Sequence, residues 1–396
     1  MKTMKNVFLF AGIALTALIY CTESKATTPT KSGLNPIAFE STIKGKKTHL
    51  FILKNKRGME VCLTNYGGRV VSLSVPDKNG KPTDVVLGYD NISQYADTAR
   101  TPSDYGSSVG RYANRIKNAT INVEGKTYKL RANDMVNCLH GGGNTGWLNK
   151  IYDVKSKNDS SVVFAITAKD GENGFPGTVK ATATYTVKSN NTLDIVFQAT
   201  TDKETVINMT NHSYFNLNGD PSKEGFNQVM YVNADKFTPS DRFYIPTGEI
   251  KDVAGTPMDF REATAIANKY DPSYDQIKNA TGYDHNWCLN TFKNGKGDDN
   301  TVAASLYSPK TGIFMEVFTN EPGIQVYTGN FQGTGISCKH GIKYPKHVSV
   351  CFESQKYPDS PTKFAAKTKG WEISNPYLKP GEKYYSHLAY KFSVKK

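Results

Sequence analysis

The stretch Thr178–Thr200, TVKATATYTVKSNNTLDIVFQAT, decides the fold of this chain. Two runs rich in Val, Thr, Ile and aromatic residues flank the polar segment Lys188–Asn191. In the first run an apolar side chain stands at every second position, which is the period of a strand with one buried face. A short polar segment between two such runs is typical of a β-hairpin. We therefore predict two long antiparallel strands.

Runs of the same kind recur along most of the chain and indicate an all-β fold. The other predicted strands are Thr48–Leu53, Met59–Thr64, Arg69–Val75, Ser161–Ala168, Val302–Tyr307, Phe314–Thr319, His347–Glu353 and Tyr384–Val394, with a further hairpin over Ile121–Leu130. The best helical window, Thr264–Asn279, is interrupted by Pro272. No linker rich in Gly, Ser or Pro divides residues 45–394. We expect a single domain, a large antiparallel β-sandwich.

The N-terminal residues are typical of a bacterial export signal. Lys2 and Lys5 precede an apolar run over residues 7–20, which is too short for a stable membrane span. Ser24–Ala26 offers small residues to a signal peptidase, so we expect the mature protein in the periplasm. We divide the chain into the signal (1–26), a leader (27–44) and the sandwich domain (45–396).

Cys21 offers an alternative to simple cleavage. The segment Leu18–Cys21 resembles a loose lipobox, so Cys21 could carry a lipid anchor. The bulky Tyr20 before it favours cleavage at Ser24–Ala26 instead. Either route places the folded domain outside the cytoplasm.

Composition and spacing exclude several classes of partner and site. The chain has 49 Lys and Arg against 36 Asp and Glu, a net charge of +13, but the lysines are spread along it, and we expect no nucleic-acid partner. Of the 6 cysteines, those after Cys21 are odd in number and form no Cys-x-x-Cys pair. We expect buried thiols rather than a disulfide framework or a zinc site. The 7 histidines lack metal-ligand spacing, so we also expect no metal.

Two histidines lie in segments suited to a polar pocket. His140 precedes three glycines in Asn137–Gly143, NCLHGGG, which leave room beside the imidazole. His212 lies in Asn208–Asn216, NMTNHSYFN, where amides, an imidazole and aromatic rings stand together. Rings can cover the C–H faces of a sugar, while amides and imidazoles bind its hydroxyls. These segments favour a sugar site.

Other polar side chains are further candidates for such a site. Asn114 and Arg115 are planar groups that make several hydrogen bonds, and Asp284 lies in a stretch rich in aromatic residues. Glu353 ends the apolar run that begins at Cys351. The strand period alone leaves open whether the Glu353 carboxylate is exposed or faces a cavity.

About a dozen segments, taken in order, resemble the aldose 1-epimerase family, the galactose mutarotases. They are Asn65–Gly68, Asp84–Tyr89, Gly110–Asn118, Leu139–Gly142, Gly174–Gly177, Thr210–Leu217, Pro246–Glu249, Gly282–Asn286, Pro322–Phe331, Tyr344–His347, Glu353–Pro361 and Pro380–Glu382. The resemblance covers roughly residues 45–394. It implies a single β-sandwich that interconverts the α and β anomers of free hexoses such as glucose or galactose, with no cofactor or metal. We expect the protein to act as a monomer.

The resemblance also implies roles for individual residues. It makes Glu353 the general base and His212 the general acid. The residues that it implies for sugar binding are Asn114, Arg115, His140, Asp284 and Gln325. The chain departs from the family pattern at Trp147, Ile151, Lys363–Asn375 and His387, which leaves loop shape and the preferred sugar open.

The residue types suit this chemistry on their own, but two rival functions remain. Anomer interconversion takes a proton from the anomeric hydroxyl and delivers one to the ring oxygen, so one acid and one base suffice. A near-neutral pKa suits His212 as the acid, and a cation such as Arg115 would keep the Glu353 base ionised. A glycoside hydrolase would instead pair Glu353 with Asp284 and leave His212 without a role. A non-catalytic sugar-binding module would not need both Glu353 and His212.

Overall fold

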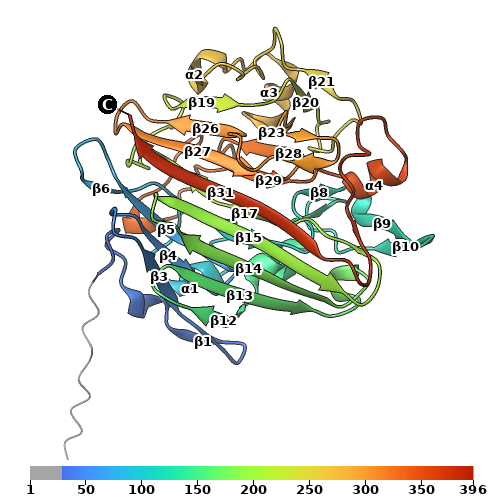
Figure 1. Cartoon of the computed structure of the whole chain (residues 1–396), viewed down its shortest axis with the longest axis horizontal. Helices are drawn as coiled ribbons and strands as arrows, with labels where there is room; N and C mark the ends of the chain where they lie inside the picture. The colour runs from blue at the N-terminus through green and yellow to red at the C-terminus, as the bar shows by residue number, and fades with distance from the viewer. Residues whose placement is uncertain (1–28, 396) are drawn as a thin grey trace, which may run out of the picture.

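The computed structural model describes residues 29–395, so the predicted export signal and Cys21 lie outside the described residues. The largest element is an antiparallel nine-stranded sheet, which crosses the view in Figure 1 with β31 near its middle. In spatial order its strands are β12 (Asp153–Lys157), β13 (Ser161–Ala168), β14 (Val179–Val187), β15 (Thr192–Thr201), β31 (Tyr384–Val394), β27 (Ile313–Thr319), β26 (Ala304–Tyr307), β19 (Val229–Val232) and β22 (Thr264–Ala265).

Two further antiparallel sheets form a second layer. The six-stranded sheet has the order β18 (Tyr214–Phe215), β29 (Val350–Gln355), β28 (Gly323–Tyr327), β23 (Asp284–Cys288), β20 (Lys236–Thr238) and β21 (Lys251–Asp252). The four-stranded sheet consists of β3 (Leu50–Lys54), β4 (Glu60–Thr64), β5 (Arg69–Pro76) and β6 (Pro82–Asp84).

Short ladders and helices complete the described part of the chain. The two-stranded ladders pair β1 (Ser41–Ile43) with β2 (Lys46–Thr48), β7 (Ser107–Val109) with β17 (Thr210–His212), β8 (Arg115–Ile116) with β11 (Cys138–Leu139), β9 (Thr120–Val123) with β10 (Lys126–Lys129), β16 (Thr205–Val206) with β30 (Tyr377–Leu378), and β24 (Phe292–Lys293) with β25 (Lys296–Gly297). The α-helices are α1 (Ile92–Ala96), α2 (Ile266–Lys269), α3 (Asp275–Ala280) and α4 (Ser360–Ala365). The 3-10 turns are η1 (Pro36–Phe39), η2 (Lys117–Ala119), η3 (Gly143–Thr145), η4 (Trp147–Asn149), η5 (Glu172–Gly174) and η6 (Lys339–Gly341).

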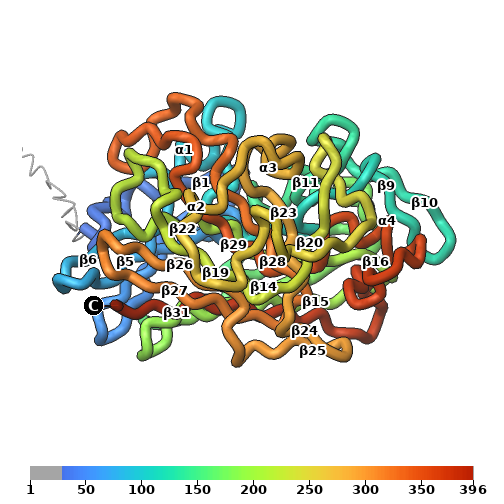
Figure 2. The backbone as a smooth tube through the Cα atoms, turned by 90° about the horizontal axis from the view of Figure 1, so that it is seen from above, coloured from blue at the N-terminus to red at the C-terminus, as the bar shows by residue number. Residues whose placement is uncertain are grey.

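Apolar side chains of all three sheets meet in one core between the layers. The ring of Phe51 on β3 lies edge-on to Phe164 on β13, with centroids 5.4 Å apart, and Phe215 on β18 lies 4.7 Å from Tyr390 on β31. The Tyr390 hydroxyl also donates a hydrogen bond to the Phe352 carbonyl of β29 at 3.0 Å. Figure 2 shows β31 and β27 along one side, β28 and β29 behind them, and α1, α3 and β11 beyond. The predicted antiparallel β-sandwich is confirmed.

The local predictions at the hairpin and at the weak helical window are also confirmed. The hairpin is the β14–β15 pair, in which Val187 lies opposite Leu193 next to the turn. The helical window contains α2 and α3, which lie on either side of Pro272. Proline lacks the backbone N–H and clashes with the preceding turn, so one continuous helix cannot form there.

The folded structure includes residues before the predicted domain boundary at residue 45. Leu34 and Phe39 are buried in a second apolar cluster, beside the four-stranded sheet. The backbone N–H of Lys31 donates a hydrogen bond to the Glu60 side chain on β4 at 2.6 Å. The expected leader therefore contributes to the packed core from about this point onward.

The cysteines of the described residues behave as the sequence predicts. All five are free thiols, and every one except Cys288 is buried. Burial raises the pKa of Cys62 and Cys138 to about 12, so both remain uncharged thiols at neutral pH. Within residues 29–395, no helix combines the length and apolar character that a membrane crossing needs.

His387 ties the middle of the large sheet to a neighbouring loop. It lies on β31, with Nδ1 2.6 Å from the Asp299 carboxylate and Nε2 2.9 Å from that of Asp194 on β15. Burial lowers the pKa of His387, but its hydrogen bonds and ion pairs with Asp194 and Asp299 outweigh burial, and the pKa is raised. The protonated ring can donate to both carboxylates.

We predict that His387→Gln lowers the free energy of unfolding by about 1–2 kcal/mol near pH 6. Because the folded-state pKa of His387 is raised, its stabilisation is complete below the unfolded-state pKa and is lost as pH rises through the folded-state value. Urea unfolding should therefore show a smaller deficit near pH 9. His49→Gln, at a partly exposed site, serves as the control. An equal deficit at both pH values would rule out the charged bridge.

Candidate functional site

Strands β18 and β29 of the second layer have one face toward the core and one toward a cavity, because successive side chains point to opposite sides. On β29, Val350 and Phe352 belong to the core between the layers, whereas Glu353 lines the cavity. On β18, Phe215 packs in the core and Tyr214 lines the same cavity. The question that the strand period left open is thus answered: Glu353 is buried, at 2% exposure, and faces a cavity.

The cavity has a volume of about 330 Å³ and is lined by residues from distant parts of the chain. Its polar lining includes Asn114, Arg115, His140, His212, Asp284 and Glu353. Its aromatic lining comprises Tyr89, Tyr105, Tyr214, Tyr327 and Phe331. The volume falls within the ~300–1,000 Å³ typical of small-molecule sites. The structure therefore brings all the expected site residues except Gln325 to one cavity.

Asn114 and His140 hold each other in place next to the β8–β11 ladder. The backbone N–H of Asn114 donates to Nδ1 of His140, and the backbone N–H of His140 donates to the Asn114 carbonyl, each at 3.2 Å. Both residues have positive φ, 62° and 51°, a conformation that the surrounding contacts must support. Burial lowers the pKa of His140 to about 3, so its ring is neutral. With Nδ1 accepting, the proton is on Nε2, which can donate.

His212 and Glu353 form a close buried pair. Nε2 of His212 lies 3.4 Å from Oε1 of Glu353. The His212 ring stacks on Tyr214, with centroids 4.8 Å apart, and meets the His140 ring edge-on at 5.3 Å. Nδ1 of His212 and Oε2 of Glu353 are buried without a hydrogen-bond partner among the described residues. Unsatisfied buried groups are costly and are typical of sites with a chemical role.

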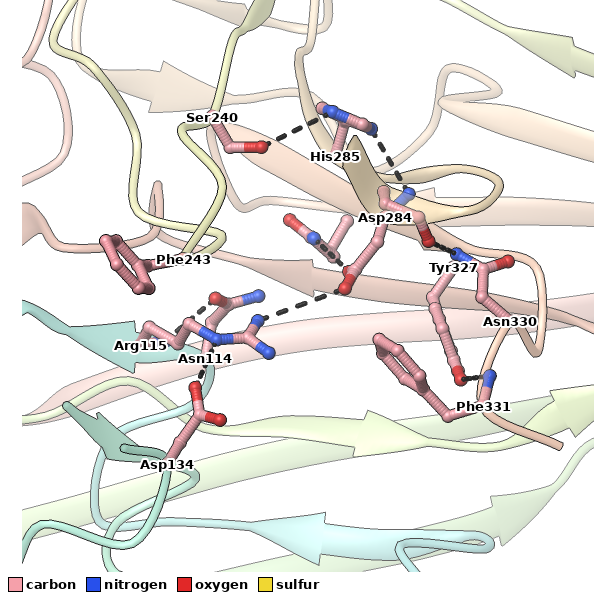
Figure 3. A network of polar contacts seen from close by, with 12 residues as sticks. Asn114, Arg115, Asp134, Ser240, Phe243, Asp284, His285, Tyr327, Asn330 and Phe331 are labelled. Carbon is pink, nitrogen blue, oxygen red and sulfur yellow. Dashed lines mark hydrogen bonds and ion pairs between the residues drawn. The ribbon is translucent and has the colours of Figure 1, made fainter. Parts of the chain in front are cut away.

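Arg115 lies between two carboxylates, as Figure 3 shows. Nε of Arg115 donates to Asp134 at 2.7 Å, and a terminal guanidinium nitrogen lies 3.9 Å from Asp284. The guanidinium group also rests over the ring of Tyr244, at 4.6 Å. Gln325 donates to the other oxygen of Asp284 at 2.7 Å. Gln325 lies directly opposite Glu353 in the β28–β29 ladder, and its hydrogen bond orients Asp284.

Burial dominates the electrostatics of the His212–Glu353 pair. Burial, together with the charges of Asp284 and Asp104, raises the pKa of Glu353 well above its ordinary value, and Arg115 opposes this shift. Burial lowers the pKa of His212, and Asp104 and Asp284 oppose that shift. The two groups are close enough to titrate together, so the apparent pKa values belong to the pair rather than to either residue.

Asp104, His140 and His212 place three potential metal ligands within 4.8 Å of one another. A metal-bound imidazole ordinarily donates its second N–H to an acceptor. His140 does the reverse, since its Nδ1 accepts from the Asn114 backbone. Its Nε2 then carries the proton and cannot bind a cation while this hydrogen bond persists. The group is better suited to the hydroxyls of a ligand than to a metal.

Nothing in the sequence predicts two acidic residues of this site. Asp104 lines the cavity, and Asp134 binds Arg115. Both lie in irregular segments, outside the strands of the structure and outside any motif with a known spacing. Only the folded chain places them beside the expected residues.

Comparisons with known proteins extend over most of the chain. A sequence model of the aldose 1-epimerase family matches residues 49–391. The aldose 1-epimerase of Escherichia coli K12 is 36% identical over 348 residues, which cover 88% of this chain and 96% of that protein. The galactose mutarotase of Bos taurus is 35% identical over 341 residues, which cover 85% and 92%.

Solved structures show the same likeness. An aldose epimerase homologue from C. elegans matches with a TM-score of 0.78 at 29% identity, over 88% of this chain and 100% of that one. The galactose 1-epimerase of Lactobacillus acidophilus matches with a TM-score of 0.75 at 26% identity, over 90% and 97%. Since the family match and these identities span nearly the whole sandwich, the chain belongs to the aldose 1-epimerase family.

Proposed function

We propose that the protein is an aldose 1-epimerase, an isomerase that interconverts the α and β anomers of free hexoses such as D-glucose or D-galactose. The observation that carries this proposal is the buried His212–Glu353 pair, 3.4 Å apart, on the wall of a cavity lined by polar and aromatic side chains. Polarimetry of freshly dissolved α-D-glucose and α-D-galactose tests it. The purified protein should speed the drift to equilibrium rotation, and a rate equal to that in buffer would refute the proposal.

Ring opening uses both members of the pair. The Glu353 carboxylate takes the proton of the anomeric hydroxyl, the C1–O5 bond breaks, and its electron pair moves to O5, which takes a proton from the His212 imidazolium. The products are a neutral carboxyl group, a neutral imidazole and an open-chain aldehyde. Rotation about C1–C2 presents the other face of the aldehyde to the O5 hydroxyl. The two proton transfers then run in reverse, and the ring closes as the other anomer.

The reactive form of the pair is one of two that hold a single proton. In the reactive form the carboxylate of Glu353 is ionised and the imidazole of His212 is protonated, whereas burial favours the form in which both are neutral. Activity should fall at low pH, where the pair gains a second proton, and at high pH, where it loses its only one. The pH profile of kcat/KM should therefore be bell-shaped.

The remaining polar residues are suited to holding sugar hydroxyls. Asp284 is oriented by Gln325 and Arg115 and can accept from hydroxyl groups. Arg115 and the Nε2–H of His140 can donate. We also propose that the protein acts as a monomer.

The geometry favours this function over a glycoside hydrolase. A hydrolase needs a second carboxyl group that acts as acid or nucleophile opposite the first. Asp284 is held in a hydrogen bond from Gln325 and faces the Arg115 guanidinium, which suits a fixed acceptor. A non-catalytic module would have no use for a buried, poorly satisfied His212–Glu353 pair, whose burial costs stability.

We predict that Glu353→Gln and His212→Asn each lower kcat by about 10²–10⁴-fold and change KM little, because each removes a proton-transfer group. The double variant should lose little more than either single one. Initial mutarotation rates measure these effects, with the exposed Glu40→Gln and His340→Asn as controls. Near-normal kcat in Glu353→Gln would transfer the role of base to Asp284.

We predict that Asp284→Asn raises KM by about 10–100-fold, because a charged acceptor for sugar hydroxyls is lost. Gln325→Leu should raise KM less, since it only frees Asp284 to move. Saturation curves for both variants decide the matter, with the exposed Asp252→Asn as the matched control. A normal KM with a reduced kcat would mean that Asp284 takes part in the proton transfers instead.

We also propose that the protein is exported to the periplasm, on the evidence of its N-terminal sequence. Fractionation of the native host should place the mature protein there, and intact-mass measurement should show cleavage at Ser24–Ala26. An added lipid mass on Cys21 would select the anchored form. Uncleaved chain in the cytosol alone would overturn the proposal.

A further inference from the structure

Asp104 lies on a short segment whose backbone is fixed from two sides. The fully buried Arg69 donates to the carbonyls on either side of it, those of Tyr105 at 2.9 Å and Ser103 at 3.1 Å. The backbone N–H and the hydroxyl of Ser107 donate to the carbonyl of Asp104 itself, at 3.0 and 2.9 Å. Burying a guanidinium group whose hydrogen bonds go only to neutral acceptors costs free energy of folding. Its effect is to fix the position of Asp104.

The same segment is joined directly to the strand that carries His212. The N–H of Gly106 donates to the His212 carbonyl at 2.9 Å, and Ser107 on β7 lies opposite His212 on β17. The Asp104 carboxylate lines the cavity and has a ligand atom within 4.8 Å of ring nitrogens of both His140 and His212. No described residue donates a hydrogen bond to this half-exposed carboxylate.

We infer that Asp104 is a positioning residue of the acid: its fixed negative charge, on the cavity wall beside His212, stabilises the imidazolium form that delivers the proton to O5. This inference rests on the proposed epimerase function. Glu353 cannot serve this purpose itself, because it must accept a proton in the same step in which His212 loses one. A second carboxylate that takes no part in the proton transfers removes that conflict.

The other charges around His212 make such a carboxylate necessary. The titratable and charged groups that face His212 or act on it are Glu353 on β29, Asp284 on β23, Arg69 on β5, His140 after β11, Tyr214 on β18, Tyr327 on β28 and Asp104 before β7. Burial and the positive charge of Arg69 disfavour the imidazolium, while Asp104 and Asp284 favour it. Asp284 is shared with Arg115, so Asp104 is the acceptor charge left for His212.

Removing the charge of Asp104 should shift the pH profile of kcat/KM along the pH axis, and not only lower kcat/KM. Asp104 raises the pKa of both His212 and Glu353. In Asp104→Asn, both limbs of the kcat/KM bell should therefore move to lower pH, by about 1 unit. At constant pH, that shift corresponds to about a tenfold loss on the basic limb and to a gain of about the same size on the acidic limb.

The experiment compares the full chain with Asp104→Asn, Asp104→Glu and Asp97→Asn. Asp104→Glu keeps the charge and should restore the wild-type limbs. Asp97→Asn removes a charge from the same stretch of chain, where it pairs with the exposed Arg100, and should leave the profile unchanged. A uniform loss at every pH, or no change, in Asp104→Asn would show a structural role or none, and would overturn the inference.

An NMR titration separates this inference from the proposed function. The imidazole signal of His212 is assigned by its absence in His212→Asn, and its titration is followed in wild type and in Asp104→Asn without any sugar. The pKa of His212 should fall in Asp104→Asn. If wild type fails to accelerate mutarotation, the proposed function fails, but the titration still decides the electrostatic role of Asp104. Identical His212 titration in both proteins would overturn that role.

Discussion

The arrangement of the site depends on strands that are buried on both faces. On β29 the side chain of Phe352 enters the core against the large sheet, and that of Glu353, one residue on, enters the cavity. A shift of register by one residue would exchange the two, placing a carboxylate in the apolar core and a benzyl group in the site. The apolar packing that stabilises the sandwich thereby also fixes which way Glu353 points. The hydrogen bond from Tyr390 to the Phe352 carbonyl fastens this register to the large sheet.

Burial holds the side chains of the site in place, and it also disfavours the charged forms of His212 and Glu353. The neutral forms of His212 and Glu353 are favoured in a dry environment, yet ring opening needs the charged forms of both. The surrounding charges reduce this conflict without removing it, since Arg115 lowers the pKa of Glu353 while Asp284 raises that of His212. Each of these charges is itself held by further groups, as when Gln325 donates to Asp284. The cost of burying them is offset by hydrogen bonds rather than by solvent.

The parts of the fold that follow local periodicity could be predicted from the sequence, and the parts that depend on tertiary packing could not. Alternation defined β14 and β15 almost to the residue, and Pro272 divided the best helical window. The same alternation could not say which face of the strand carrying Glu353 was covered, because both faces are. Asp104 lies on an irregular loop positioned by Arg69, which is 35 residues away in sequence.

Resemblance to a family located the site more closely than the residue pattern did, but it did not distinguish contact with the ligand from support. Gln325 matches a sugar-binding position, and in this chain its side-chain amide also holds Asp284. Asn114 and His140 show the converse. Both have positive φ and hold each other by hydrogen bonds, and this mutual support could not be predicted from any sequence motif. The types and spacing of residues in the sequence show which chemical groups the chain offers, whereas the role of each group follows from its contacts in the folded structure.

Reversibility explains why an acid–base pair of this kind suits the reaction. The two anomers differ little in free energy, so the same groups must open and close the ring from either side. His212 and Glu353 lie 3.4 Å apart and together hold one proton before and after each complete cycle. Ring closure returns every proton to its starting group, so the pair needs no exchange with solvent between turnovers. A buried acid–base pair is therefore compatible with rapid repeated catalysis, and the constraint falls on keeping the surrounding charges fixed while one proton passes from the sugar to Glu353 and another passes from His212 to the sugar.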